Sequence, residues 1–151
     1  MNTYIDVIGM AKRLSVARAG ASLTLGQTAK ILGITVSGVH SWERADRIPV
    51  ISRVIDIAAA YGVSHGHILG IDSTGSIDMK AIPRRIYLAR IGSRLGGLSL
   101  RGAGPIVGVS SSTIATWEKG TRNPRISTIN LIASGYDVSV DFLLGMVPYD
   151  E

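Results

Sequence analysis

Side chains that catalyse reactions are scarce in this chain. It has no cysteine, and its three histidines lie at positions 40, 65 and 67. His65 and His67 have no cysteine or acidic neighbour at the spacing that metal ligands require. No glycine-rich phosphate loop and no paired carboxylates appear either. The sequence therefore predicts a protein that is not an enzyme and binds neither a metal ion nor a cofactor.

Basic side chains outnumber acidic ones in both halves of the chain. The net charge is +5. The first 75 residues contain 7 basic and 5 acidic residues, and the remaining 76 contain 9 and 6. Neither half has a polybasic tail. This distribution favours binding to a polyanion through individually placed contacts, with ordinary solubilising charge as the alternative.

One long segment occurs twice. Residues 31–70 align without a gap with residues 106–145, which lie 75 positions later. From Leu23 and Leu98 onward, about 18 of roughly 48 paired positions are identical. The shared positions include Trp42-Glu43 with Trp117-Glu118, Arg47 with Arg122, Pro49 with Pro124, and Leu69-Gly70 with Leu144-Gly145. A repeat of this length indicates a duplicated folding unit.

A first helix is predicted upstream of the repeated segment. In the first copy, apolar residues recur at three-residue steps, which predicts an amphipathic helix: Ile8, Ala11, Leu14 and Ala17. Residues 13–18 match residues 85–90 at an offset of 72. The second copy therefore carries about three extra residues between its first and second helices.

Four shorter helices follow in each copy. In the first copy we expect them at about residues 24–32, 36–44, 52–61 and 64–70, with hydroxyl residues as N-caps and glycine where a helix ends. The second copy repeats this punctuation at Ser99, Gly108, Ser110, Pro124, Ser127, Ser139 and Gly145. Strand patterns are absent. The prediction is an all-α protein with two tandem five-helix domains.

The domain boundaries follow from the repeat. The domains are expected at residues 1–71 and 82–147, with a tail at 148–151 that frays. The polar stretch around Gly75 predicts a flexible linker over 72–81, about 17 Å long on average and about 35 Å when extended. No apolar run reaches the ~18 residues of a membrane span, and no secretory signal is present. Together with the lack of cysteine, this predicts a cytoplasmic protein that does not enter a membrane.

Two short helices joined by a three-residue turn, the second followed by Trp-Glu, resemble the five-helix domains of the lambda repressor/Cro family. The first copy has AKILGITVSGVHSWERADRIP and VIDIAAAYGVSHGHILG. The second has GPIVGVSSSTIATWEKGTRNP and INLIASGYDVSVDFLLG. The resemblance covers nearly the whole chain twice, and the Trp-Glu and final Leu-Gly elements make it specific. It implies a sequence-specific regulator of transcription that binds double-stranded DNA, of the kind found in phages and prophages.

The resemblance places the third helix of each copy in the major groove. From this placement, the residues expected to contact bases lie at the start of each third helix or close to it. They are Gln27, Thr35, Val36, Ser37, Gly38 and Ser41 in the first copy, and Ser110, Ser111, Ser112, Thr113 and Thr116 in the second. Hydroxyls can bond to base edges and Val36 can contact a thymine methyl, but the residues at the start of the two third helices cannot form the bidentate pairs that Arg or Gln form with a base. Gln27 is a longer side chain nearby. For Ser110, capping of the helix is an equal alternative.

Phosphate contacts are expected from basic residues that flank these helices: Arg44, Arg47, Arg101, Lys119, Arg122 and Arg125. The family also pairs the acid after Trp with an arginine of the first helix. By the repeat alignment, the expected pairs are Glu43 with Arg18 and Glu118 with Arg90, with Arg94 as a substitute for Arg90. The two tryptophans are expected to pack inward.

The second copy departs from the family pattern. Gly104-Pro105 falls where its second helix should form, which predicts a shortened or displaced helix. Both copies also have Leu, at positions 25 and 100, where the family often has Gln.

Three functional hypotheses remain. The first is a monomer that binds an asymmetric DNA site with two non-identical domains. The second keeps DNA binding in the first domain and uses the second domain for homodimerisation. The third is a protein-interaction module, such as an antitoxin.

Overall fold

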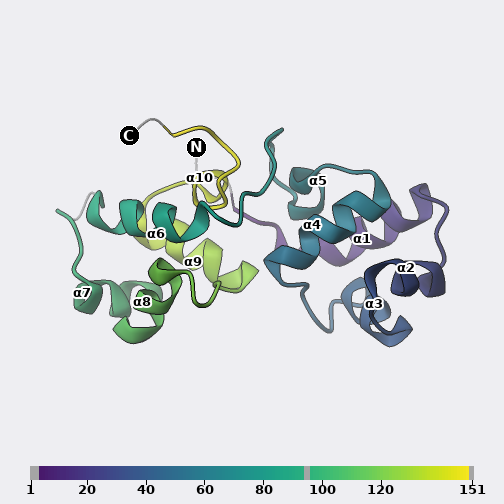
Figure 1. The fold of residues 1–151 in the computed structure, drawn as a ribbon, viewed down its shortest axis with the longest axis horizontal. Coiled ribbons are helices and arrows are strands. Elements are labelled where there is room, and N and C mark those ends of the chain that lie inside the picture. Colours follow the sequence, from purple (N-terminus) through teal and green to yellow (C-terminus); the bar gives the residue numbers. More distant parts are fainter. Residues whose placement is uncertain (1–3, 94–95, 150–151) are drawn as a thin grey trace. The chain divides into compact units, whose positions relative to one another are not determined.

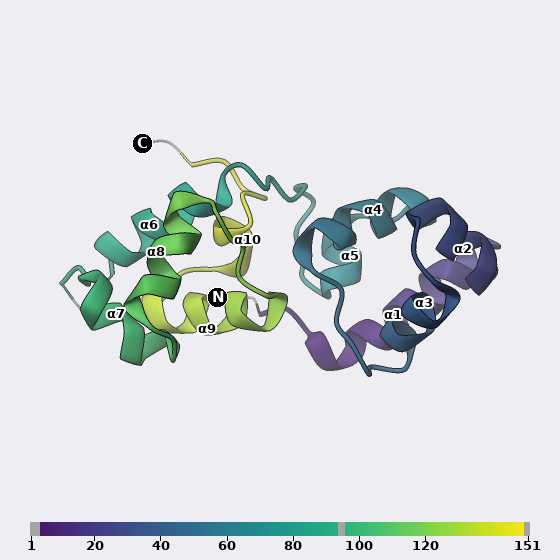
Figure 2. The same cartoon turned by 60° about the horizontal axis from the view of Figure 1, so that its bottom comes forward.

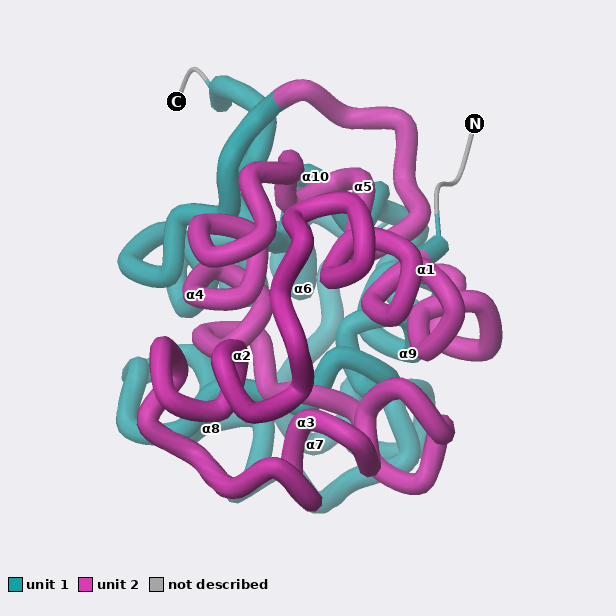
Figure 3. Tube along the Cα trace, turned by 90° about the vertical axis from the view of Figure 1, so that its right-hand side faces the viewer, with its two compact units in different colours: residues 1–4, 75–151 teal, residues 5–74 magenta. Residues whose placement is uncertain are grey.

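The computed structural model describes residues 4–93 and 96–149, and these residues form helices and no strands (Figure 1). They divide into two compact units, of which one is Ile5–Thr74 and the other consists mainly of the chain from Gly75 onward (Figure 3). The first unit contains α1 (Val7–Gly20), α2 (Leu25–Leu32), α3 (Val36–Glu43), α4 (Ile51–Tyr61) and α5 (His65–Leu69). The second contains α6 (Ile82–Ile91), α7 (Leu100–Val107), α8 (Ser111–Lys119), α9 (Ile126–Tyr136) and α10 (Val140–Leu143). The prediction of an all-α fold with tandem helix-turn-helix units is confirmed.

The first helix buries only part of the predicted apolar face. Met10, Leu14 and Ala17 are buried, whereas Ile8 is 93% exposed. A strict three-residue step falls behind the 3.6-residue turn by about 60° each time, so it drifts off one face of the helix. Steps of four and three residues keep Met10, Leu14 and Ala17 in register. The prediction for Ile8 was therefore wrong.

Each unit has the same internal packing. In the first unit α1 contacts α3, α4 and α5, and α2 contacts α3 and α4. In the second unit α6 contacts α8, α9 and α10, and α7 contacts α8 and α9. Tyr61 and Tyr136, at the ends of α4 and α9, are both buried, as expected of core residues. The pair α2–α3 and the pair α7–α8 are seen from a second direction in Figure 2.

The second helix of the second copy is complete, contrary to the prediction. The helix α7 has 8 residues, the same number as α2, and Pro105 lies inside it. Pro105 is exposed, so the helix carbonyl that loses its usual partner can bond to water. Gly104 lies close to the backbone of the turn that follows α7: a Cβ at this position would be 2.9 Å from the carbonyl oxygen of Val109. The glycine therefore allows the turn after α7 to pack tightly.

The segment between the units is more ordered than a flexible linker. A Cβ on Gly66 would lie 2.5 Å from the Ser73 carbonyl oxygen, so the chain up to Ser73 packs back on α5. A Cβ on Gly75 would lie 1.7 Å from the Met146 carbonyl oxygen. The Asp78 N–H donates to the Leu144 carbonyl at 2.9 Å, and Ile77 is buried. The freely variable stretch is therefore much shorter than ten residues.

The C-terminal tail is held against the second unit as far as the structure describes it. The Tyr149 ring packs edge-on against Phe142, with ring centroids 5.3 Å apart. The Arg85 guanidinium lies over both rings and donates to the Val147 carbonyl at 2.9 Å. The expectation of a frayed tail was wrong for residues 148 and 149; residues 150 and 151 lie outside the described residues.

Candidate nucleic-acid interface

The helix α3 of the first unit, which is its predicted recognition helix (the helix expected to enter the major groove), is held by its turn and by its cap. Gly33 ends α2 in left-handed backbone, with φ 67°, and the Ile34 N–H donates to the Ala29 carbonyl at 3.0 Å. The Thr35 hydroxyl then accepts from the Gly38 N–H at 3.0 Å, which starts α3. It also lies 3.1 Å from the Ser37 hydroxyl. Thr35 is thus the N-cap of the helix as well as a predicted DNA contact.

The corresponding helix of the second unit, α8, begins in the same way. The Ser110 hydroxyl accepts from the Thr113 N–H at 3.2 Å, so Ser110 is the N-cap. The same hydroxyl lies 3.0 Å from that of Ser112 and 2.9 Å from that of Thr113. Ser111 is exposed and makes none of these contacts. Capping, the alternative considered for Ser110, is what the structure shows.

The predicted base contacts differ in how far they face solvent. Val36 is 49% exposed, and Ser37, Ser111 and Ser112 are also exposed. By contrast, Ser41 and Thr116 are half-buried and donate to the carbonyls of Gly38 and Thr113.

Gln27 has a structural role as well, since its Oε1 atom accepts from the Thr24 N–H at 2.9 Å in a capping box. Gly38 is half-buried beside the Thr35 cap. The outward-facing side chains best placed to meet a base edge are therefore those of Val36, Ser37, Ser111 and Ser112.

Two buried ion pairs fix the recognition helices to the first helix of each unit. Arg18 donates to Glu43, with Nη2 3.1 Å from Oε2, and also to the Leu23 carbonyl at 2.9 Å. Arg90 donates to Glu118 through Nε and Nη2, at 3.1 and 2.8 Å. The hydrogen bond to Glu43 raises the pKa of Arg18. Both pairs are those that the repeat alignment predicts.

Arg94, the predicted substitute for Arg90, lies outside the described residues. Arg90 itself also donates to the Leu98 carbonyl at 2.6 Å, so its guanidinium spans from α8 to the loop before α7. Arg90 is 9% exposed. Each recognition helix therefore depends on an ion pair that is shielded from water.

The basic residues proposed for phosphate contacts are all exposed: Arg44, Arg47, Arg101, Lys119, Arg122 and Arg125. Arg44 lies 3.4 Å from Asp46, an exposed acid with no counterpart in the second unit, where residue 121 is threonine. Residues 119–125 thus carry three basic residues and no acid, while the aligned residues 44–50 carry two basic residues and one acid. The second copy therefore has the larger net positive charge at this place.

The two tryptophans, aligned in the repeat, are packed to different degrees. Trp117 is 5% exposed, in agreement with the expectation of inward packing. Trp42 is only half-buried and lines a surface cavity. Inward packing was therefore only partly correct for Trp42.

One pair of structural residues was missed by the sequence reasoning. The Arg13 Nε atom donates to the Ile68 carbonyl at 3.0 Å, and its guanidinium contacts Asp6 at 2.8 Å. Arg85 donates to the Phe142 carbonyl at 2.9 Å in the second unit. Both arginines hold the last helix of their unit to the first. The signal was present, because residues 13 and 85 are identical in the matched stretch that contains Arg18 and Arg90.

Other kinds of site find little support among the described residues. No group of three or more His, Cys, Asp and Glu side chains in this part of the chain is arranged to hold a metal ion. No helix in the described ranges is both long and apolar enough to cross a lipid bilayer.

Two exposed N-capped helices, each supported by a preceding helix and flanked by basic residues, define a DNA-binding protein of the helix-turn-helix class. A family model described as Helix-turn-helix matches the chain twice, at residues 14–68 and 89–143. The chain belongs to this family, in its lambda repressor/Cro type, and contains two tandem copies of the domain. Searches of curated proteins and of solved structures find no match. Domains of this family bind DNA and regulate transcription, and they are generally not enzymes.

Proposed function

We propose that this chain is a phage-type or prophage-type repressor that binds one asymmetric DNA site as a monomer. In this proposal each unit inserts its own recognition helix into the major groove, and the two half-sites differ in sequence. A repressor of this kind acts in the cytoplasm of the cell that holds its DNA. The single observation that carries the proposal is a difference between the two exposed helix faces: Val36 in the first is replaced by Ser111 in the second, beside the shared serines Ser37 and Ser112.

The chemistry of these faces differs in kind. Val36 offers a branched apolar surface that suits a thymine methyl. Ser111 and Ser112 offer hydroxyls that can donate to or accept from a base edge or a phosphate. Because a symmetric site would require two equal faces, two unequal faces favour an asymmetric site.

The phosphate contacts proposed for the two units are also unequal. Because residues 119–125 carry three basic residues and the aligned residues 44–50 include an acid, the second unit is expected to contribute more of the salt-dependent affinity. We assign the first unit a larger share of the discrimination among bases, since Val36 makes the more selective contact. The division of labour is between affinity and specificity, with DNA contacts from both units.

The connection between the units bears on the spacing of the half-sites. Ser73 packs on its own unit and Gly75 packs on the other. Because the connection between the units is short, we expect the two half-sites to tolerate little increase in the number of base pairs that separates them.

Homodimerisation through the second unit is the second candidate. The observation in its favour is the apolar exposed pair Ile106 and Leu131, 37% and 53% exposed, on α7 and α9. At the position aligned with Leu131, the first unit has the charged Asp56, which lies 3.7 Å from Arg53. Sedimentation of the free protein distinguishes the candidates, because the monomer proposal predicts a single chain at concentrations that saturate DNA.

The test of DNA contact by both units uses one substitution in each. Ser37→Glu and Ser112→Glu place a carboxylate at the second residue of α3 and of α8. An acid in the first turn stabilises a helix, so both variants are expected to fold. Each should lose specific binding in an electrophoretic shift assay, because the carboxylate meets the negative potential of the groove. Ala59→Glu and Ser134→Glu, at exposed aligned positions on α4 and α9, are the controls and should bind normally. If only Ser37→Glu abolishes binding, the second unit does not contact DNA.

A further inference from the structure

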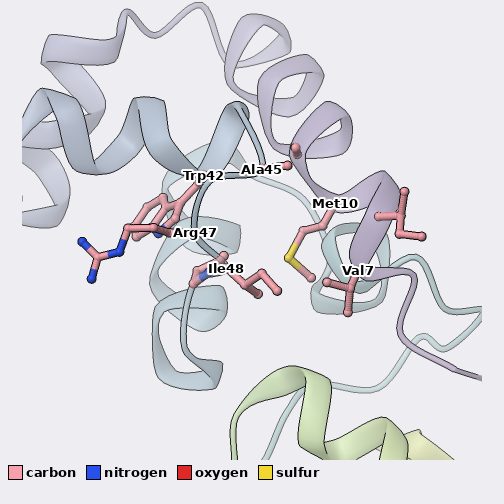
Figure 4. Close-up of a pocket in the computed structure, with 9 residues that line it drawn as sticks. Val7, Met10, Trp42, Ala45, Arg47 and Ile48 are labelled. Atoms are coloured by element: carbon pink, nitrogen blue, oxygen red, sulfur yellow. The ribbon is translucent and has the colours of Figure 1, made fainter.

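The first unit contains an apolar cavity that its fold does not require. The cavity has a volume of about 240 Å³ and lies between α1 and the loop that joins α3 to α4 (Figure 4). Its lining residues are apolar with one exception: Val7, Ile8, Met10, Ala11, Trp42, Ala45, Ile48 and Pro49, together with Arg47. Figure 4 shows Met10, Val7 and Ile48 gathered around one hollow, with the Trp42 ring at its end and the Arg47 guanidinium extending outward at its edge.

The corresponding place in the second unit is lined differently. The residue aligned with Ala11 is Pro83, whose ring lies against the loop after α8: a Cβ on Gly120 would be 3.3 Å from the Pro83 Cγ atom. Trp117, aligned with Trp42, is buried. The second unit has a hollow of its own at the aligned place, lined by more polar side chains: Lys80, Pro83, Arg84, Tyr87, Glu118 and Lys119. What distinguishes the cavity of the first unit is therefore its apolar lining.

The residues at the rim of the cavity are apolar in the first unit and polar in the second. Ile8 and Ile48, which are 93% and 43% exposed, correspond to Lys80 and Asn123. Two exposed isoleucines at the mouth of a cavity lower the solubility of a protein, whereas polar residues at the same positions do not. The isoleucines are explained if a ligand covers them.

The charges around the cavity favour an anion. The two nearby acids are already engaged, Asp6 by Arg13 at 2.8 Å and Asp46 by Arg44 at 3.4 Å. Among the described residues, Arg47 at the mouth and Lys12, one turn from Ile8, have no ion-pair partner. A ligand with an apolar body and a single carboxylate would match this arrangement, since binding pockets combine apolar walls with a few polar groups that fix orientation.

We propose that this cavity binds a small apolar carboxylate, with its ring or chain against Met10 and Trp42 and its carboxylate on Arg47. The size is suitable, because an engineered apolar cavity of about 150 Å³ is known to hold benzene. A phenyl ring with a short carboxylate chain therefore fits a cavity of about 240 Å³. The site would make the protein responsive to a small organic acid.

Binding at this site has a consequence that rests on the proposed function. Arg47 is also a proposed phosphate contact, so a carboxylate on its guanidinium competes with DNA. The bound acid should therefore weaken DNA binding while leaving the recognition helix in place.

The test uses 3-phenylpropionate as the probe and the full-length chain. Trp42 lies in the cavity wall, so its fluorescence should change and saturate as the probe is added. Calorimetric titration of the unmodified protein provides a second measurement that does not depend on tryptophan. The neutral amide of the same acid should bind roughly threefold more weakly, which is the size of effect that an exposed charge pair gives. Arg47→Gln should abolish that difference between acid and amide.

The control variant removes the apolar rim without adding a charge. Ile8→Gln with Ile48→Asn replaces both rim isoleucines by neutral polar side chains, at exposed positions where folding is not at risk. This variant should bind the probe at least tenfold more weakly, a loss that corresponds to about 1.4 kcal/mol. Equal binding by this variant, or no saturable binding by the unmodified chain, would overturn the proposed site. A chain that binds the probe but no DNA would instead contradict the proposed function, so the two failures are distinguishable.

Discussion

Replacement of Glu118 by glutamine is expected to destabilise the second unit selectively. Glu118 accepts three hydrogen bonds from Arg90, at 2.8 to 3.1 Å, and both side chains are about 10% exposed. Glutamine keeps the shape of the side chain but removes its charge, which leaves the Arg90 guanidinium buried beside a neutral group. The remaining bond to the Leu98 carbonyl does not balance that charge.

The size of the effect follows from the burial of the pair. Removing one partner of a buried ion pair costs about 3–5 kcal/mol, because the other charge stays away from water. A unit of this size has a total stability of only about 3–10 kcal/mol. Glu118→Gln should therefore cost the second unit about 3 kcal/mol and bring it close to unfolding at room temperature. Asp56→Asn, which breaks the exposed pair with Arg53, should cost at most about 0.5 kcal/mol.

Tryptophan fluorescence separates the two units. In a Trp42→Phe background, Trp117 is the only tryptophan, and it lies in the second unit next to Glu118. Urea unfolding followed by its emission should show a clear loss of stability in Glu118→Gln. In a Trp117→Phe background, the emission of Trp42 should show the first unit unfolding at its usual urea concentration. A loss of less than about 1 kcal/mol in the second unit would refute the argument from burial.

Four further substitutions test other parts of the account. Ala45 has φ 61° and the aligned Gly120 has φ 77°, a left-handed backbone conformation that favours glycine. Ala45→Gly should therefore stabilise the first unit by about 1 kcal/mol, and Gly120→Ala should destabilise the second. Urea unfolding measures both effects. Tyr136→Phe removes a buried hydroxyl that has no hydrogen-bond partner in the structure and should stabilise the second unit by about 1 kcal/mol; a lower stability would mean that the hydroxyl is bonded. Burial raises the pKa of Tyr136 to about 12, so the unfolded chain ionises first and the second unit should lose stability between about pH 10 and pH 12, a loss that the Phe variant lacks. Arg122→Ala should reduce the slope of log affinity against log salt by about one, and an unchanged slope would place Arg122 off the DNA.

The repeat made most of the fold predictable, since each copy supports the interpretation of the other. The pair Arg90–Glu118, for example, follows from an alignment across two different offsets. The face of α1 was mispredicted because a simple apolar period, which included Ile8, took no account of the neighbouring Met10. The effect of Pro105 was overestimated, because the sequence does not show that the freed carbonyl faces water or that Gly104 allows a close backbone contact.

The candidate site was harder to predict than the fold. Hydroxyl residues serve equally as helix caps and as DNA contacts. Only the structure distinguishes Thr35 and Ser110, which cap their helices, from Ser111, which does not. The cavity of the first unit depends on how far Trp42 is covered by α1, which is a matter of packing. The sequence differs there, with Ala11 in the first copy and Pro83 in the second, but this difference alone does not predict which tryptophan is covered.

The central claim is that one chain contacts DNA through two different recognition helices. Selection of bound sequences from a random DNA pool by the full-length protein tests it most directly. The account predicts a non-palindromic site with two unlike half-sites at a constant spacing, bound by one chain. A palindromic site would contradict it, and so would a single half-site that the second unit does not contact.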